Sequence, residues 1–267
     1  MRKQVIAFAS TNPESQRGQC PEFARVCHNL LMCGRYRLSR RKQLVEEYFD
    51  TASDVPEWSP RYNIAPTQSV IRPKELRREL SLMRWGLIPS WSKDMSGAAM
   101  MINARSETAA TKPAFRDPLT SRRCLVPADG FYEWKRSGKA KQPYCFEVNG
   151  GQLFAFAGLW DRWKDPSGQW VKSCSILTTT ANAVTSPVHV RMPVILDPDG
   201  YDLWLDPGMM NVEAVSDLLK PYDARKMRAA RRSLLSRCSP RQFGSKNWLW
   251  ARPSPARNRG SWHVLAW

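Results

Sequence analysis

Apolar positions follow a helical spacing only in short stretches of this chain. In residues 39–49, SRRKQLVEEYF, four apolar residues recur at that spacing: Leu44, Val45, Tyr48 and Phe49. Ser39 precedes them, and serine is a residue type that caps helix N-termini. The pattern predicts a helix here. It also predicts a helix that follows a short strand within residues 101–115, and another helix around residues 211–219.

Most of the remaining pattern is that of β-strands. Residues 61–73 predict a turn and a strand, with residues 79–89 as its partner. Residues 122–180 consist of short apolar or alternating runs divided by Gly, Pro and Asn, and DPSG at 165–168 is typical of a hairpin turn. Many strands joined by short turns predict an α+β fold with a largely antiparallel β-sheet or barrel-like core and flanking helices.

The two ends of the chain lack this regular pattern. Residues 1–32 mix polar and apolar residues without a clear period, and residues 229–267 are rich in Arg, Ser, Pro and Trp. That composition suits a disordered basic tail, although tryptophans are unusual in disordered segments. We therefore predict one domain over residues 33–228, preceded by an N-terminal extension and followed by an atypical basic tail.

Charge changes this picture little. The chain has a net charge of +17, but residues 220–267 carry twelve Lys/Arg against one acid. Residues 32–219 carry 25 Lys/Arg against 21 acids, so the body of the protein is only mildly basic. The total charge by itself is therefore weak support for nucleic-acid binding.

Composition excludes several classes of protein. No run approaches the roughly 20 apolar residues that a membrane helix needs, and the apolar run after Lys3 is too short for a secretory signal. The seven cysteines are dispersed and the three histidines lie apart, so we predict no metal site and no cofactor. An odd number of dispersed cysteines suits a reducing compartment, and we expect a cytoplasmic monomer with no membrane partner.

Five short segments contain polar or charged residues, and four of them also contain Gly or Pro. They are MCGR (32–35), YNIAP (62–66), INARSET (102–108), GFYEWK (130–135) and HVRMP (189–193). Each has an ordinary explanation when taken alone: a common turn, an acid that alternates out of a strand, or a surface histidine. Their order, together with WGLIP at 85–89, resembles the SOS response-associated peptidase (SRAP) family, the abasic-site processing proteins. The resemblance covers about residues 32–228.

The resemblance implies a special role for Cys33. In that family the cysteine directly follows the initiator methionine and becomes the first residue when the methionine is removed. Met32 is then the expected start, and residues 1–32 are a misassigned extension or a propeptide. The α-amine of a terminal cysteine titrates at about 7.7–8.0, so part of it is neutral and nucleophilic near neutral pH. Its amine and thiol together can close a thiazolidine ring on the aldehyde of an abasic site.

The resemblance assigns roles to the remaining motif residues. Glu133 is expected to be the general acid/base and His189 to assist opening of the sugar ring, while Asn103 orients the sugar and the cysteine. A second group is expected to contact DNA, through arginine–phosphate bonds, an aromatic and apolar edge, and a close approach of glycine: Gly34, Arg35, Trp85, Pro89, Trp91, Arg105 and Arg191. The implied partner is single-stranded DNA that carries abasic sites.

Other readings stay open. An imine intermediate permits β-elimination, so a lyase activity is possible chemistry for the same site. A Cys, His, Asn and Glu set could instead run acyl transfer in a self-processing peptidase or amidohydrolase. A passive binder of single-stranded DNA needs none of the motifs.

Residues after Arg228 do not resemble the close of the family domain, which indicates either out-of-frame translation or a native DNA-binding extension.

Overall fold

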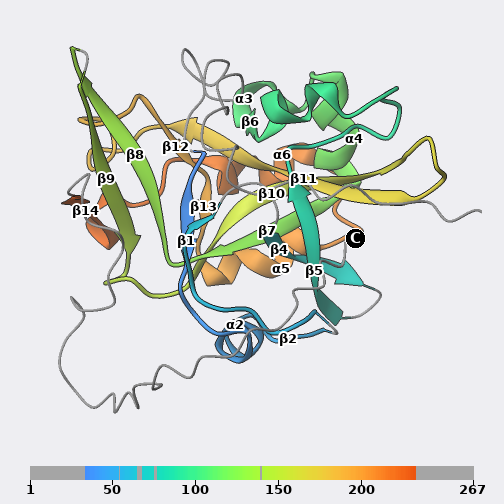
Figure 1. Ribbon diagram of the computed structural model, residues 1–267, viewed down its shortest axis with the longest axis horizontal. Helices are drawn as coiled ribbons and strands as arrows, with labels where there is room; N and C mark the ends of the chain where they lie inside the picture. Colours follow the sequence, from blue (N-terminus) through green and yellow to red (C-terminus); the bar gives the residue numbers. More distant parts are fainter. Residues whose placement is uncertain (1–33, 54, 65–67, 75–76, 139, 233–267) are drawn as a thin grey trace, which may run out of the picture. The chain divides into compact units, whose positions relative to one another are not determined.

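The computed structural model describes residues 34–232 apart from residues 54, 65–67, 75–76 and 139 (Figure 1). Cys33 and the tail from residue 233 onward therefore lie outside the described residues. Within the described part, two β-sheets carry most of the chain, and short helices lie at their edges and ends. No helix among the described residues is long and apolar enough to span a membrane.

The smaller sheet joins the start of the domain to its end. Its neighbouring strands are all antiparallel. In spatial order they are β14 (Met227–Arg231), β9 (Ala140–Val148), β8 (Gly130–Ser137), β1 (Tyr36–Leu38) and β3 (Arg61–Ile64). β14 runs past residue 228, the predicted end of the domain, and the backbone N–H of Arg232 still donates to the carbonyl of Pro143. Two small alanines in β14 gave no apolar alternation from which to predict a strand.

The larger sheet curls back on itself. Its path runs through β12 (Arg191–Pro193), β11 (Trp170–Thr180), β10 (Phe154–Lys164), β7 (Arg123–Ala128), β4 (Gln68–Lys74), β5 (Arg77–Trp85) and β2 (Thr51–Ala52). β11 also pairs in parallel with β5, through Ser173 and Arg84, which returns the path to an earlier strand. Two short strands extend it: β6 (Asn103–Arg105) along β11 and β13 (Ile195–Leu196) along β10. The predicted α+β fold with a barrel-like core is confirmed.

The helices are short and sit beside the sheets. They are α2 (Lys42–Phe49), α3 (Ser106–Ala109), α4 (Pro113–Ser121), α5 (Tyr201–Leu205) and α6 (Val212–Ser216), with single 3-10 turns η2 (Ser96–Met101), η3 (Pro198–Gly200), η4 (Asp217–Leu219) and η5 (Ala224–Lys226). The predicted helix at 39–49 exists as α2 but begins only at Lys42. Ser39 does not cap it, because its hydroxyl and its N–H both donate to Asp129.

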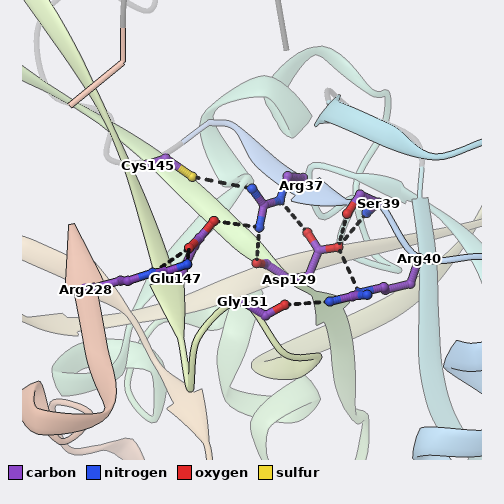
Figure 2. A network of polar contacts seen from close by, with 8 residues as sticks. All are labelled: Arg37, Ser39, Arg40, Asp129, Cys145, Glu147, Gly151 and Arg228. Atoms are coloured by element: carbon purple, nitrogen blue, oxygen red, sulfur yellow. Dashed lines mark hydrogen bonds and ion pairs between the residues drawn. The ribbon is translucent and has the colours of Figure 1, made fainter. Parts of the chain in front are cut away.

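Ser39 belongs to a buried ionic network centred on Arg37 (Figure 2). The Arg37 side chain is almost fully buried, and its Nε donates to the Asp129 carboxylate at 2.6 Å. Its second nitrogen reaches the backbone carbonyl of Asp129 at 2.7 Å and the Glu147 carboxylate at 3.1 Å. Arg228 binds the other oxygen of Glu147. The network therefore ties β1 to the β7–β8 turn, to β9 and to β14.

Electrostatics in this network favour the ionised forms. Burial opposes ionisation of Glu147, but hydrogen bonds from Arg228 and Arg37 outweigh burial and hold the pKa of this carboxyl below its ordinary value. Gly130 makes room for the pair, since a Cβ there would lie 3.2 Å from Cζ of Arg37. The Asp-Gly step in the motif PADGFYEW thus has a structural purpose: the aspartate binds the guanidinium and the glycine leaves space for it.

Replacing Asp129 by alanine is expected to destabilise the domain by about 3–5 kcal/mol, because Arg37 would keep a buried charge without its main counterion. Urea unfolding followed by circular dichroism measures this. Asp117→Ala is the matched control, since Asp117 forms an exposed pair with Arg116 and its removal should change stability by less than about 0.5 kcal/mol. Equal losses in the two variants would contradict a special role for the buried pair.

Candidate functional site

The start of the described chain lies against β8. The Arg35 carbonyl accepts a hydrogen bond from the backbone N–H of Tyr132 at 3.1 Å. Because Tyr36 faces Phe131 in the antiparallel register, the same register continued by two residues brings Gly34 opposite Glu133. A Cβ on Gly34 would be in ordinary contact with Ile102, at 3.7 Å. Residue 34 therefore lies between β8 and the segment that leads into β6.

Glu133 is a buried acid, only 3% exposed. It lies on the same face of β8 as the core residue Phe131, since alternate residues of a strand share a face. The ordinary explanation, in which this acid alternates out toward solvent, is therefore wrong. β8 therefore carries the Glu133 carboxyl group inward, at the position where Gly34 lies opposite it.

Asn103 reaches the same region from the other side. It begins β6, directly after Ile102, and faces Ile176 of β11 in a parallel register. Arg105, two residues on, is exposed at the end of β6, immediately before α3. Gly34 lies close to Ile102, the residue before β6. Gly34, Asn103 and Glu133 therefore come from three separate parts of the sequence to neighbouring positions.

His189 lies half-buried in the loop between β11 and β12. Its Nδ1 is within hydrogen-bond distance of both backbone groups of Arg191, the N–H at 3.2 Å and the carbonyl at 3.3 Å. Burial lowers the pKa of His189 below its ordinary value, and the positive charges of Arg136 and Arg191 lower it further, against a raising effect of the backbone bond. The imidazole is therefore held mainly neutral at pH 7.

Arg191 holds this loop in place. Its guanidinium donates to both carboxylate oxygens of Glu107, at 2.9 and 2.8 Å, and to the backbone carbonyl of Thr178 at 2.7 Å. These hydrogen bonds lower the pKa of Glu107 and keep it ionised. They connect β12 to α3 and β11, so the predicted contact of Arg191 with a phosphate requires this fork to open. Glu107 was not predicted as a site residue, although it belongs to the INARSET motif.

Arg35 is oriented by another motif. Its guanidinium donates to Oδ1 of Asn63 at 3.2 Å, in an exposed setting. Asn63 comes from YNIAP, on β3, which pairs with β1. No role was predicted for Asn63 from the sequence. The structure shows that it positions one of the predicted DNA-contacting arginines.

The predicted aromatic edge is corrected in part. Trp85 is only 2% exposed, its indole N–H donates to the carbonyl of Ile102 at 2.7 Å, and its ring packs edge-on against Tyr36. Pro89 is also buried. Neither is available to stack on a base, because the WGLIP segment turns inward at Gly86, where a Cβ would lie 2.6 Å from the carbonyl oxygen of Ala98. Trp91 alone of this set is exposed, at 63%.

No cluster of three or more His, Cys, Asp or Glu residues that could hold a metal occurs in the part of the chain described. The site instead brings the buried carboxyl of Glu133 and the amide of Asn103 near Gly34, beside the exposed Arg35, while His189 lies in the loop between β11 and β12. That set suits proton transfer beside an anionic substrate.

Comparison with known proteins identifies the family. A family model described as SOS response associated peptidase (SRAP) matches residues 32–233. The chain belongs to the SRAP family. It is 42% identical over 203 residues to abasic site processing protein YoqW of Bacillus subtilis, a match that spans 74% of this chain and 91% of that one.

More distant relatives share the SRAP domain. The abasic site processing protein HMCES of Gallus gallus is 33% identical over 208 residues, covering 63% of this chain and 62% of that protein. A crystal structure of a Bacteroides thetaiotaomicron protein superposes with a TM-score of 0.71 at 31% identity, covering 76% of this chain and 93% of the other. The SRAP fold is therefore shared well beyond the motifs.

The electrostatic effect on His189 is directly measurable. Arg136→Gln should raise the pKa of His189 toward its ordinary value, because one of the two neighbouring cations that lower it is removed. Proton NMR titration of the imidazole resonances measures the shift, and only three histidines need to be assigned. Arg225→Gln is the control, since Arg225 pairs with Asp223 on an exposed turn. An unchanged His189 titration in Arg136→Gln would exclude the interaction.

Proposed function

We propose that this SRAP protein recognises abasic sites in single-stranded DNA and joins them covalently through Cys33 as the N-terminal residue. The observation that carries the proposal is the position of Gly34, which the register of β1 and β8 brings opposite the buried Glu133. A cysteine directly before Gly34 would begin within reach of that carboxyl. The names of the relatives support the same substrate class.

The proposed reaction balances with the loss of one water. The neutral α-amine of Cys33 adds to the C1′ aldehyde of the ring-opened sugar, and the carbinolamine loses water to give an imine. The thiol then adds across the imine: sulfur bonds to C1′, and the thiol proton ends on the nitrogen. The product is a five-membered thiazolidine. A cysteine inside a chain cannot react in this way, because its nitrogen is an amide.

Each side chain has a proton-transfer or orienting role in this scheme. Glu133 takes a proton from the attacking amine and returns it to the departing hydroxyl. His189, neutral at pH 7, takes the proton of the C1′ hydroxyl as the bond from C1′ to the ring oxygen breaks, and returns that proton to the ring oxygen. Asn103 offers amide donors and an acceptor to the sugar. Glu107 and Arg191 hold the His189 loop against α3 and β11.

Exposed groups around these residues would bind the strand. Arg35, oriented by Asn63, and Arg105 at the end of β6 present guanidinium groups for phosphates. Trp91 offers an exposed ring for stacking on a base. Gly34 leaves the backbone open to close approach. The same imine permits β-elimination of the 3′ phosphate when ring closure is slow, so a weak lyase activity accompanies the proposal.

The proposal requires a free terminus at Cys33. Two versions of the chain test it on single-stranded DNA with one abasic site: one begins at Met32 and loses that methionine, and one carries an added alanine before Cys33. The first should give a DNA-linked band that survives heat and detergent on a denaturing gel. The second retains the thiol, but its free α-amine belongs to the alanine and not to the cysteine, so it should give no such band. Mass spectrometry verifies each N-terminus.

Two substitutions separate the roles of the site residues. Cys33→Ser should abolish the stable crosslink, because a hydroxyl does not close the thiazolidine. Glu133→Gln should slow its formation by about 10²–10⁴-fold, the usual contribution of a general acid/base, without preventing it. A stable crosslink from the alanine-extended chain would overturn the mechanism. Correctly processed, folded protein that forms no crosslink would overturn the proposed function.

A further inference from the structure

The hairpin of β10 and β11 carries an exposed basic and aromatic surface that the proposed site does not use. In Figure 1 this hairpin (yellow) projects to the right, beyond the label of β11. We call four of its residues the hairpin surface: Arg162, Lys164, Trp170 and Lys172. All four are exposed, and Trp170 is 59% exposed despite its size. We propose that the hairpin surface binds the single-stranded DNA arm that flanks the lesion.

Cross-strand register puts the four side chains on one face. Arg162 lies opposite Lys172, and Lys164 lies opposite Trp170. Directly opposed residues in an antiparallel pair point to the same side. The arginine lies over the Trp170 ring at 5.1 Å from its centroid, and the Lys164 amine lies at 5.9 Å. The indole is therefore flanked by cations and remains open to a further stacking partner.

The other face of the hairpin fixes it to the domain. Trp163 is 4% exposed and packs with Ile88 and Ala98, and its indole N–H donates to the carbonyl of Ser92 at 2.6 Å. The loop that these contacts hold also carries Trp91. The hairpin surface is thus presented by a strand pair whose opposite side is buried.

The charge pattern indicates an anionic partner. Arg162 and Lys172 are like charges in directly opposed positions, which destabilises a strand pair. Between residues 162 and 172, the acidic residue is Asp165, which binds Ser167 within the turn. A phosphate backbone would relieve the repulsion among the three cations, and a base would stack on Trp170. This combination of cations and an exposed aromatic ring is the one that binds single strands without sequence preference.

The hairpin surface lies at a distance that suits a flanking arm. β11 runs from Trp170 to the neighbourhood of the site, where Thr178 pairs with Arg105. Eight residues of strand at about 3.4 Å each span about 27 Å. A stacked DNA strand with a rise of about 3.4 Å per nucleotide covers this distance in about eight nucleotides. Short oligonucleotides would reach the site but not the hairpin surface.

The proposal for the hairpin surface rests on the proposed function, and oligonucleotides of two lengths distinguish a failure of one from a failure of the other. The protein that begins at Cys33 is titrated against a 5-mer with a central abasic site and against a 31-mer with 15-nucleotide arms. The variant R162Q/K164Q/K172Q should need more protein to crosslink half of the 31-mer, while the 5-mer should be unaffected. The slope of log half-saturation against log salt should fall by about 2, from three phosphate contacts at about 0.7 each. R41Q/K220Q/R225Q removes as many exposed cations from other elements and should leave both substrates unchanged.

Trp170 is tested separately. W170S should weaken half-saturation on the 31-mer by about fivefold or more, the usual effect of losing one stacked base. It should have no effect when the arms are base-free phosphodiester spacers. Affinity for a lesion-free 31-mer, measured by fluorescence anisotropy, gives the same comparison without crosslinking, so failure of the crosslink reaction does not prevent the test. Hairpin variants with unaltered 31-mer binding in both assays would overturn the proposal.

Discussion

The buried ion pair between Arg37 and Asp129 is the constraint on which the arrangement of the site depends. β1 is only three residues long and begins directly after the first described residues. A strand of this length makes only a few ladder hydrogen bonds with its neighbours β8 and β3. The Arg37 guanidinium is bound by Asp129 and Glu147, and Glu147 is bound in turn by Arg228. The position of Gly34 against Glu133 follows from this anchorage.

The same principle, a charged group held by partners behind the reacting residues, recurs on the opposite side. Arg191 binds Glu107 through both carboxylate oxygens and thereby fixes the loop that carries His189. Trp85 fixes the backbone before Asn103 from the core, since its indole N–H donates to the carbonyl of Ile102. Asn103 and His189 are therefore each one or two positions from a residue that the structure immobilises. Preorganisation of this kind lowers the entropic cost of bringing groups into a reactive geometry.

The proposed contacts with DNA depend on the local surroundings of single residues more than on the net charge of the chain. Most of the excess charge of the chain lies after residue 220, whereas the groups proposed to touch DNA are single arginines and exposed rings at strand ends and on one hairpin. Arginines that appear equivalent in the sequence have different surroundings. Arg37 and Arg191 are bound by carboxylates, Arg35 is oriented by an amide, and Arg105 is exposed.

The sequence by itself determined the architecture and the family. Alternating apolar runs and turn residues predicted the strands from 122 to 180, and the order of six motifs indicated the family and predicted the site. Only the tertiary structure decided which motif residues are accessible. Trp85 and Trp91 are equally aromatic in sequence, yet Trp85 is buried because it packs against Tyr36 and bonds the carbonyl of Ile102, whereas Trp91 is exposed. Ser39 was predicted to cap a helix but binds Asp129, 90 residues away. Local pattern specifies periodicity, whereas burial and ion pairing depend on partners that only the folded chain brings together.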